Sequence, residues 1–125
     1  MPDKLGAGDL ARERMTFQSR GVGDDGFGNA MIDAGPFEDR FTVSAHLRPL
    51  RGSETVIAAR LQGRQPYIIT VRQSSDTRQA NEAWRIVDTR NHDRVFAIKA
   101  PPTDPDGKRA WLEILCVLGE ETEDS

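Results

Sequence analysis

The stretch Phe41-Thr42-Val43-Ser44-Ala45-His46-Leu47 decides the fold class of this chain. Apolar and polar side chains alternate along it without a break, and this period of two is typical of a β-strand with one face on a core. The same alternation returns in Tyr67–Arg72 and in Trp111–Val117. In Trp111–Val117, Leu112, Ile114 and Cys116 form one wholly apolar face. We therefore expect a protein built mainly from β-strands.

Shorter strands are expected at Arg14–Ser19, Trp84–Val87 and Val95–Ile98. Turn-favouring residues separate the strands, among them the polar stretch Arg90–Arg94 and the proline-rich stretch Pro101–Gly107. The pattern predicts a small single-domain β-barrel or sandwich of about six short antiparallel strands with long loops. The predicted core includes Phe17, Val43, Leu47, Ile69, Val71, Ile86, Ile98, Leu112 and Ile114.

Three segments do not follow the strand pattern. Glu54–Leu61 fits a short helix about as well as a strand, and Leu5–Arg14 could form one helical turn with Asp9 as a candidate N-cap. The glycine-rich segment Gly21–Gly28 lacks the lysine and the helix that a phosphate-binding loop needs, and its two aspartates would repel phosphate. We interpret it as a flexible hairpin tip.

Length and charge limit the classes of function. The chain has 125 residues, so we expect one domain at residues 1–118, followed by a disordered acidic tail at residues 119–125. The net charge is −3, and four acidic residues lie in the last six positions, which leaves the rest of the chain near neutrality. A dedicated DNA-binding protein normally has a strong basic excess, so the charge argues against that class.

Targeting signals are not expected in this sequence. It has no apolar run of about 18 residues that would predict a membrane-spanning helix. The first residues, Met1–Gly6, lack the apolar region of a secretory signal. The single cysteine, Cys116, cannot form an internal disulfide, and it falls on the apolar face of its strand. We expect Cys116 to be a core residue of a protein made in a reducing cytoplasm.

The residues that could support catalysis or metal binding are few. Ser44, His46 and Asp39 contain the residue types of a triad, but positions two apart on a strand do not have the directed geometry of a nucleophile and its base. His92 and Asp93 would supply only half of a metal site in a turn. We therefore expect a protein that is not an enzyme and holds no cofactor or metal.

Arginines are concentrated in the middle of the chain. With Tyr67 they could form a nucleic-acid platform of the OB-fold type, although acidic residues dilute the charge and aromatic residues do not recur along one strand face. Arginine is also enriched at protein–protein interfaces, which is the interpretation that we favour. The arginines concerned are Arg48, Arg51, Arg60, Arg64, Arg72 and Arg78.

Five short motifs follow one another in a fixed order between residues 8 and 117. They are Gly8-Asp9-Leu10 with Arg14-Met15-Thr16-Phe17-Gln18, then Asp25-Gly26-Phe27-Gly28, Ala45–Glu54, Ile69-Thr70-Val71-Arg72 and Arg109–Cys116. Each is weak alone, but in this order they resemble the head–tail joining (head closure, or stopper) proteins of tailed phages and of gene transfer agents. Two features depart from that family: a tryptophan before the Pro-Leu strand is replaced by Phe37 or Phe41, and Pro101–Lys108 is longer than expected.

The resemblance implies a structural protein in the neck of a virion or phage-like particle. Such a protein closes the DNA channel after packaging and offers a docking surface to the tail. The implied partners are further copies in a hexameric or dodecameric ring, a portal-side adaptor and a tail terminator or tail protein, with transient proximity to packaged double-stranded DNA. Assembly is implied in the cytoplasm of a bacterial host, without a membrane.

The segment Leu50–Pro66 is the candidate interface or channel loop, because it is far longer than a hairpin needs. The resemblance implies that a loop of this kind points into the channel and helps to hold DNA back. The alternative that remains is a small OB-like nucleic-acid-binding barrel. The candidate site residues, with one from the preceding strand, are Arg48, Arg51, Gly52, Glu54, Arg60, Gly63 and Arg64.

Overall fold

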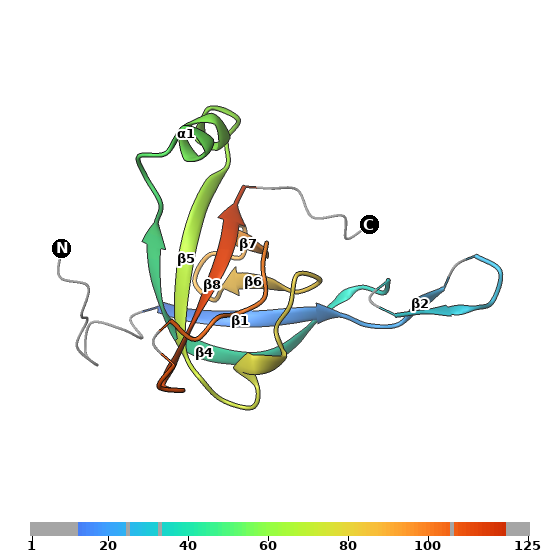
Figure 1. Cartoon of the computed structure of the whole chain (residues 1–125). Coiled ribbons are helices and arrows are strands. Elements are labelled where there is room, and N and C mark those ends of the chain that lie inside the picture. Colours follow the sequence, from blue (N-terminus) through green and yellow to red (C-terminus); the bar gives the residue numbers. More distant parts are fainter. Residues whose placement is uncertain (1–12, 25, 33, 106, 120–125) are drawn as a thin grey trace.

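Six antiparallel strands close into a barrel in the computed structural model, which describes residues 13–24, 26–32, 34–105 and 107–119 (Figure 1). The strand β1 (Glu13–Arg20) pairs with both β4 (Phe37–Pro49) and β6 (Arg85–Asp88), and this double pairing closes the barrel. Around the barrel the order is β1, β4, β5 (Gln65–Arg72), β8 (Trp111–Leu118), β7 (Val95–Ile98) and β6. The predicted mainly β fold is confirmed, and of the two predicted architectures, barrel and sandwich, the structure has the barrel.

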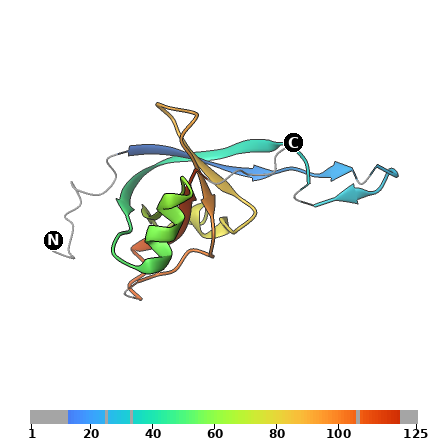
Figure 2. The same cartoon turned by 90° about the horizontal axis from the view of Figure 1, so that it is seen from above.

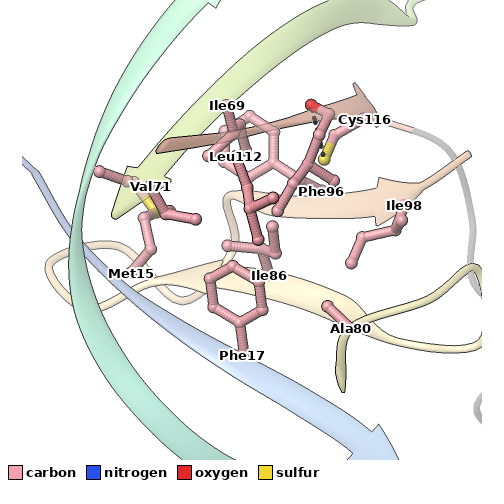
Figure 3. Packing of buried hydrophobic residues seen from close by; sticks show 12 residues of the cluster. Met15, Phe17, Ile69, Val71, Ala80, Ile86, Phe96, Ile98, Leu112 and Cys116 are labelled. Atoms are coloured by element: carbon pink, nitrogen blue, oxygen red, sulfur yellow. Dashed lines mark hydrogen bonds between the residues drawn. The ribbon is translucent and has the colours of Figure 1, made fainter. Parts of the chain in front are cut away.

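The core follows the alternation of side chains along each strand. Facing residues of β5 and β8 meet in register, with Ile69 opposite Ile114 and Val71 opposite Leu112. Figure 3 shows Ile69, Val71 and Leu112 gathering with Phe17 inside the barrel, and Ile114 belongs to the same cluster. The fully confirmed core predictions are Phe17, Ile69, Val71, Ile86, Ile98, Leu112 and Ile114, all buried.

Two predicted core residues, Val43 and Leu47, are only partly buried and pack against the edge of the cluster. Cys116 is buried, as its position on the apolar face of β8 predicted. Burial raises the pKa of the Cys116 thiol far above its ordinary value, because the apolar surroundings disfavour the thiolate.

The expectation of short strands is wrong for β4, which runs for 13 residues from Phe37 to Pro49. The polar residues at its start do not look like a strand, but they pair with the end of β1 across a bulge near Phe17 and Gln18. The predicted strand at Trp84–Val87 lies one residue later, as β6. Trp84 instead packs at the core beside Phe41, with ring centroids 6.0 Å apart.

A polar cluster of ion-paired side chains connects neighbouring segments at the end of the barrel where β1 begins. The Arg94 guanidinium donates to Glu13 at 3.0 Å and to the buried Asp88 at 3.2 Å. Burial tends to lower the pKa of Arg94, but hydrogen bonds to Tyr67, Asp88 and Glu13 outweigh it and leave that pKa raised. The cluster therefore links β1, β6 and the turn before β7.

Three smaller elements lie between the barrel strands. A two-stranded hairpin, β2 (Gly23–Asp24) with β3 (Ala30–Met31), interrupts the path from β1 to β4. The helix α1 (Glu54–Leu61) lies between β4 and β5, and the 3₁₀-helix η1 (Thr77–Gln79) lies between β5 and β6. None of the helices in the described part of the chain is long and apolar enough to cross a membrane. The helical turn predicted at Leu5–Arg14 falls largely outside the described residues, as does most of the acidic tail.

Candidate subunit interface

The β4–β5 connection contains the predicted interface or channel segment. Its two ends are tied together, since the Leu50 amide donates to the Pro66 carbonyl at 2.9 Å and the Gln65 side chain donates to the Leu50 carbonyl at 2.9 Å. Between these ties the chain forms a bend, the helix α1 and a turn. The predicted loop is therefore about half helical, and the choice left open for Glu54–Leu61 is settled in favour of the helix.

Local sequence explains where α1 begins and ends. The Ser53 hydroxyl accepts a hydrogen bond from the Val56 amide at 3.1 Å, which makes Ser53 the N-cap. Glu54 lies in the first turn and Arg60 in the last, so both charges complement the helix dipole. Beyond the helix, Gly63 adopts a φ of 80° and donates to the Arg60 carbonyl at 3.0 Å, a conformation that favours glycine.

The helix is held to the barrel by a small apolar contact. Val56 is buried, whereas Ile57 is 48% exposed and Leu61 is 84% exposed. An eight-residue helix is marginal in water without tertiary packing. Two of its three large apolar side chains nevertheless face solvent, which is the arrangement expected of a docking element.

All of the candidate site residues are exposed on β4 or on this connection. Arg48 lies on β4 opposite Ile68, and Gly52 has a φ of 95° in the bend before α1. The remaining five lie on α1 or in the segments next to it, namely Arg51, Glu54, Arg60, Gly63 and Arg64. Six of the seven predicted residues thus lie on the β4–β5 connection, which projects from the barrel (Figure 1), and Arg48 lies on the strand that leads into it.

A second projection, the hairpin segment at residues 21–36, was not among the predicted site residues. It extends well away from the barrel (Figures 1 and 2). Its side chains include Phe27, 88% exposed, and Ile32, 84% exposed. The sequence indicates a hairpin tip here, but it does not by itself show that the apolar residues between the glycines are exposed. Those apolar residues were the signal that could have found it.

The base of the hairpin segment is built with close backbone contacts. The Gly35 amide donates to the Gly21 carbonyl at 2.8 Å, and the Arg20 guanidinium donates to the carbonyls of Gly35 and Ala34 at 2.7 and 3.1 Å. A Cβ on Gly35 would meet the Val22 carbonyl oxygen at 2.7 Å, so a larger residue does not fit. The projection is therefore oriented by its base.

Phe37 lies beside this base, between two cations. The guanidinium carbons of Arg20 and Arg85 lie 5.4 and 3.9 Å from the centre of its ring. Such contacts contribute about 0.5–2 kcal/mol each, depending on solvent exposure. Phe37 thus helps to fix the position at which β4 leaves the hairpin.

The other residues considered for chemistry lie apart or make structural contacts. Ser44 accepts a hydrogen bond from Arg14 at 3.2 Å, and Asp39 accepts one from Gln18 at 2.7 Å, while His46 lies two residues beyond Ser44 on β4. His92 is exposed in the turn between β6 and β7. Among the described residues, no group of three or more histidine, cysteine or carboxylate side chains could hold a metal ion.

The predicted nucleic-acid platform is only partly assembled. The rings of Tyr67 and Phe96 pack edge to face with their centroids 5.2 Å apart, so the Tyr67 ring is part of the packing of the barrel. Arg72 lies over the Trp111 ring at 4.6 Å and, with Arg14, lines a surface hollow of about 430 Å³. The arginines of the β4–β5 connection do not line this hollow.

The described architecture is that of a small closed β-barrel with two projections and without an assembled catalytic centre among its described residues. Comparison with known proteins gives its family. A family model described as phage head completion protein matches residues 7–121, and the chain belongs to this family. The role of the family is structural, in the head of a phage particle. The resemblance inferred from the sequence motifs is thereby confirmed.

Two solved structures share the fold. Protein SF1141 of Shigella flexneri 2a is 28% identical, with a TM-score of 0.63 over 94% of this chain and all of that chain. A chain in the virion of a native gene transfer agent particle is 18% identical, with a TM-score of 0.58 over 85% of this chain and 92% of that one. No curated protein matches the chain.

Proposed function

We propose that this chain is a head-closure (stopper) subunit that forms a ring in the neck of a phage-like particle. The ring closes the DNA channel after packaging and presents the surface on which the tail docks. The observation that carries the proposal is the match to the head completion family over residues 7–121. The likeness to a chain in a gene transfer agent virion supports the fold on which the proposal relies.

The proposed partners follow from this position in the particle. Further copies of the chain form the ring, a portal-side adaptor contacts one face, and a tail terminator or tail protein contacts the other. The β4–β5 connection lies towards the channel, where Arg51, Arg60 and Arg64 meet DNA phosphates or carboxylates of a neighbouring copy. Its exposed arginines and its small contact with the barrel support this assignment.

Replacement of residues 54–64 by a Gly-Ser linker tests the proposal. The ties from Leu50 to Gln65 and Pro66 lie outside the deletion, so we expect the barrel to stay folded. Particles that carry the variant should leak DNA or fail to join tails. Normal DNA retention and normal tail joining would remove the connection from the mechanism.

A charge test separates the arginines from the rest of the connection. The variant Arg51→Ala/Arg60→Ala should reduce DNA retention or tail joining. The matched control is Arg78→Ala/Arg90→Ala, which removes two exposed arginines elsewhere on the barrel. Equal effects of the two double variants would contradict a specific role for the connection.

A second candidate function is single-stranded nucleic-acid binding by an OB-like barrel. The hollow where Arg14, Arg72 and Trp111 lie together favours it. Its test is binding of the isolated protein to single-stranded DNA at several salt concentrations. Tight binding that falls steeply with salt and is lost in Arg72→Ala would favour this alternative.

A further inference from the structure

Exposed apolar side chains gather at two places in the described part of the chain. Seven large hydrophobic residues are exposed there; two of them, Ile57 and Leu61, belong to α1, and one, Leu115, belongs to β8. The other four belong to the hairpin segment at residues 21–36: Val22, Phe27, Met31 and Ile32. Apolar residues concentrated on projecting elements mark contact surfaces more often than scattered ones do.

The two segments differ in the sign of the charge that their sequences carry. The hairpin segment contains three aspartates and neither lysine nor arginine. The connection at residues 50–66 contains three arginines against one glutamate. Each segment therefore combines exposed apolar side chains with a formal sequence charge opposite in sign to that of the other segment, and such complementarity steers and orients association.

The two surfaces of one copy lie on different sides of the barrel. In both views the hairpin extends away from the barrel on the side remote from α1 (Figures 1 and 2). A contact between them must therefore join two copies. A contact between two different patches is heterologous, and it closes into a ring when the rotation between copies allows.

We propose that the hairpin segment of one copy docks on the exposed side of α1 in the next copy. Phe27 and Ile32 supply the apolar contacts to Ile57 and Leu61, and the arginines beside α1 meet the acidic hairpin. This inference rests on the ring in the proposed function and names the surfaces that would build it. It also gives the small, weakly attached helix a reason to expose its apolar side chains.

The shape of the hairpin base favours such docking. Arg20 and the close backbone contacts at Gly35 fix the direction of the hairpin before it meets a neighbour, which lowers the entropy lost on binding. The contact is nevertheless narrow, one two-stranded hairpin against one eight-residue helix. Stable interfaces bury about 1,200–2,000 Å² in total, so this one should be weak between two free copies. It becomes effective when other contacts hold the copies side by side in the particle.

Photo-crosslinking in assembled particles tests this contact. The variant Phe27→p-benzoyl-phenylalanine, incorporated into particles and irradiated, should give a dimer of this chain whose adduct maps to residues 54–64. Adding Leu61→Asp should reduce that adduct roughly tenfold, as expected when a central apolar contact is lost. The matched control, His92→p-benzoyl-phenylalanine, places the same reagent at an exposed turn of the barrel and should not give this adduct.

The outcomes separate this inference from the function on which it rests. An adduct between Phe27 and another particle protein, an adduct with another part of this chain, or no adduct at all would overturn the docking. The proposed function would survive each of these results. Absence of the wild-type protein from particles would overturn the proposed function, and the docking with it.

Discussion

Two leucine-to-alanine substitutions make the same chemical change at opposite kinds of site. Leu112 is 4% exposed in β8 and faces Val71 across the β5–β8 pair, whereas Leu61 is 84% exposed at the end of α1. At Leu112 the substitution removes carbon groups from the core, and each removed group forfeits about 0.8 kcal/mol of the free energy gained by burying it away from water. The cavity left behind adds to this, so the total loss should be about 2–5 kcal/mol. Leu61→Ala leaves no cavity in the free protein and should change stability by less than about 0.5 kcal/mol.

Urea unfolding followed by tryptophan fluorescence measures both values. With a slope of about 2 kcal/mol per molar urea, the loss at Leu112 becomes a midpoint shift of roughly 1–2.5 M. Leu61→Ala should keep the wild-type midpoint but weaken incorporation into particles. Equal stability losses for the two variants, or a loss below about 1 kcal/mol at Leu112, would refute the placement of these residues.

Three other predictions concern the thiol, the hairpin and the polar cluster. Burial raises the pKa of the Cys116 thiol, so the folded protein keeps the thiol protonated and maleimide labelling at pH 8 should be slow until the protein unfolds. The free energy of unfolding should fall as the pH rises above the thiol pKa of the unfolded chain, about 8.5. Fast labelling of the folded protein would contradict burial. Gly35→Ala should lower the free energy of unfolding by about 1–3 kcal/mol and speed hydrogen exchange at the amides of residues 21 and 35, because the added Cβ meets the Val22 carbonyl. Unchanged exchange would show that the backbone at the base of the hairpin is not closely packed. Arg94→Ala leaves Asp88 buried without its ion pair and should cost about 1–3 kcal/mol in thermal or urea unfolding, whereas Glu13→Gln, at a half-exposed site, should cost less than about 1 kcal/mol. The reverse order of these two losses would contradict the importance of Asp88.

The barrel strands could be predicted because their signal is local. In the middle of β1, in most of β5 and throughout β8, every second side chain is apolar and packs in or against the core, so a short window of sequence contains the pattern. The start of β4 could not be found in this way, since Glu38, Asp39 and Arg40 are all polar. Their strand geometry comes from pairing with β1 across a bulge, which is a contact between distant parts of the chain.

The place of the candidate residues on the fold could be predicted in part, and their role stays a prediction. The length and arginines of the β4–β5 connection singled it out, and its candidate residues are all exposed. Its helix stayed ambiguous because Val56 is the only buried side chain among those of the helix that the structure describes, so the sequence lacks a clear amphipathic period. The hairpin tip was predicted, but its exposed apolar surface was not, because β2 and β3 have two residues each, too few to show an alternation. Its apolar exposure became visible only with the fold.

The neck of purified particles offers the most direct test of the head-closure assignment. An electron cryo-microscopy reconstruction should show this barrel repeated in a closed ring between the portal side and the tail. Its β4–β5 connections should point towards the channel, and each hairpin should lie on α1 of the next copy. A neck built without this barrel, in particles that retain their DNA and carry tails, would contradict the account.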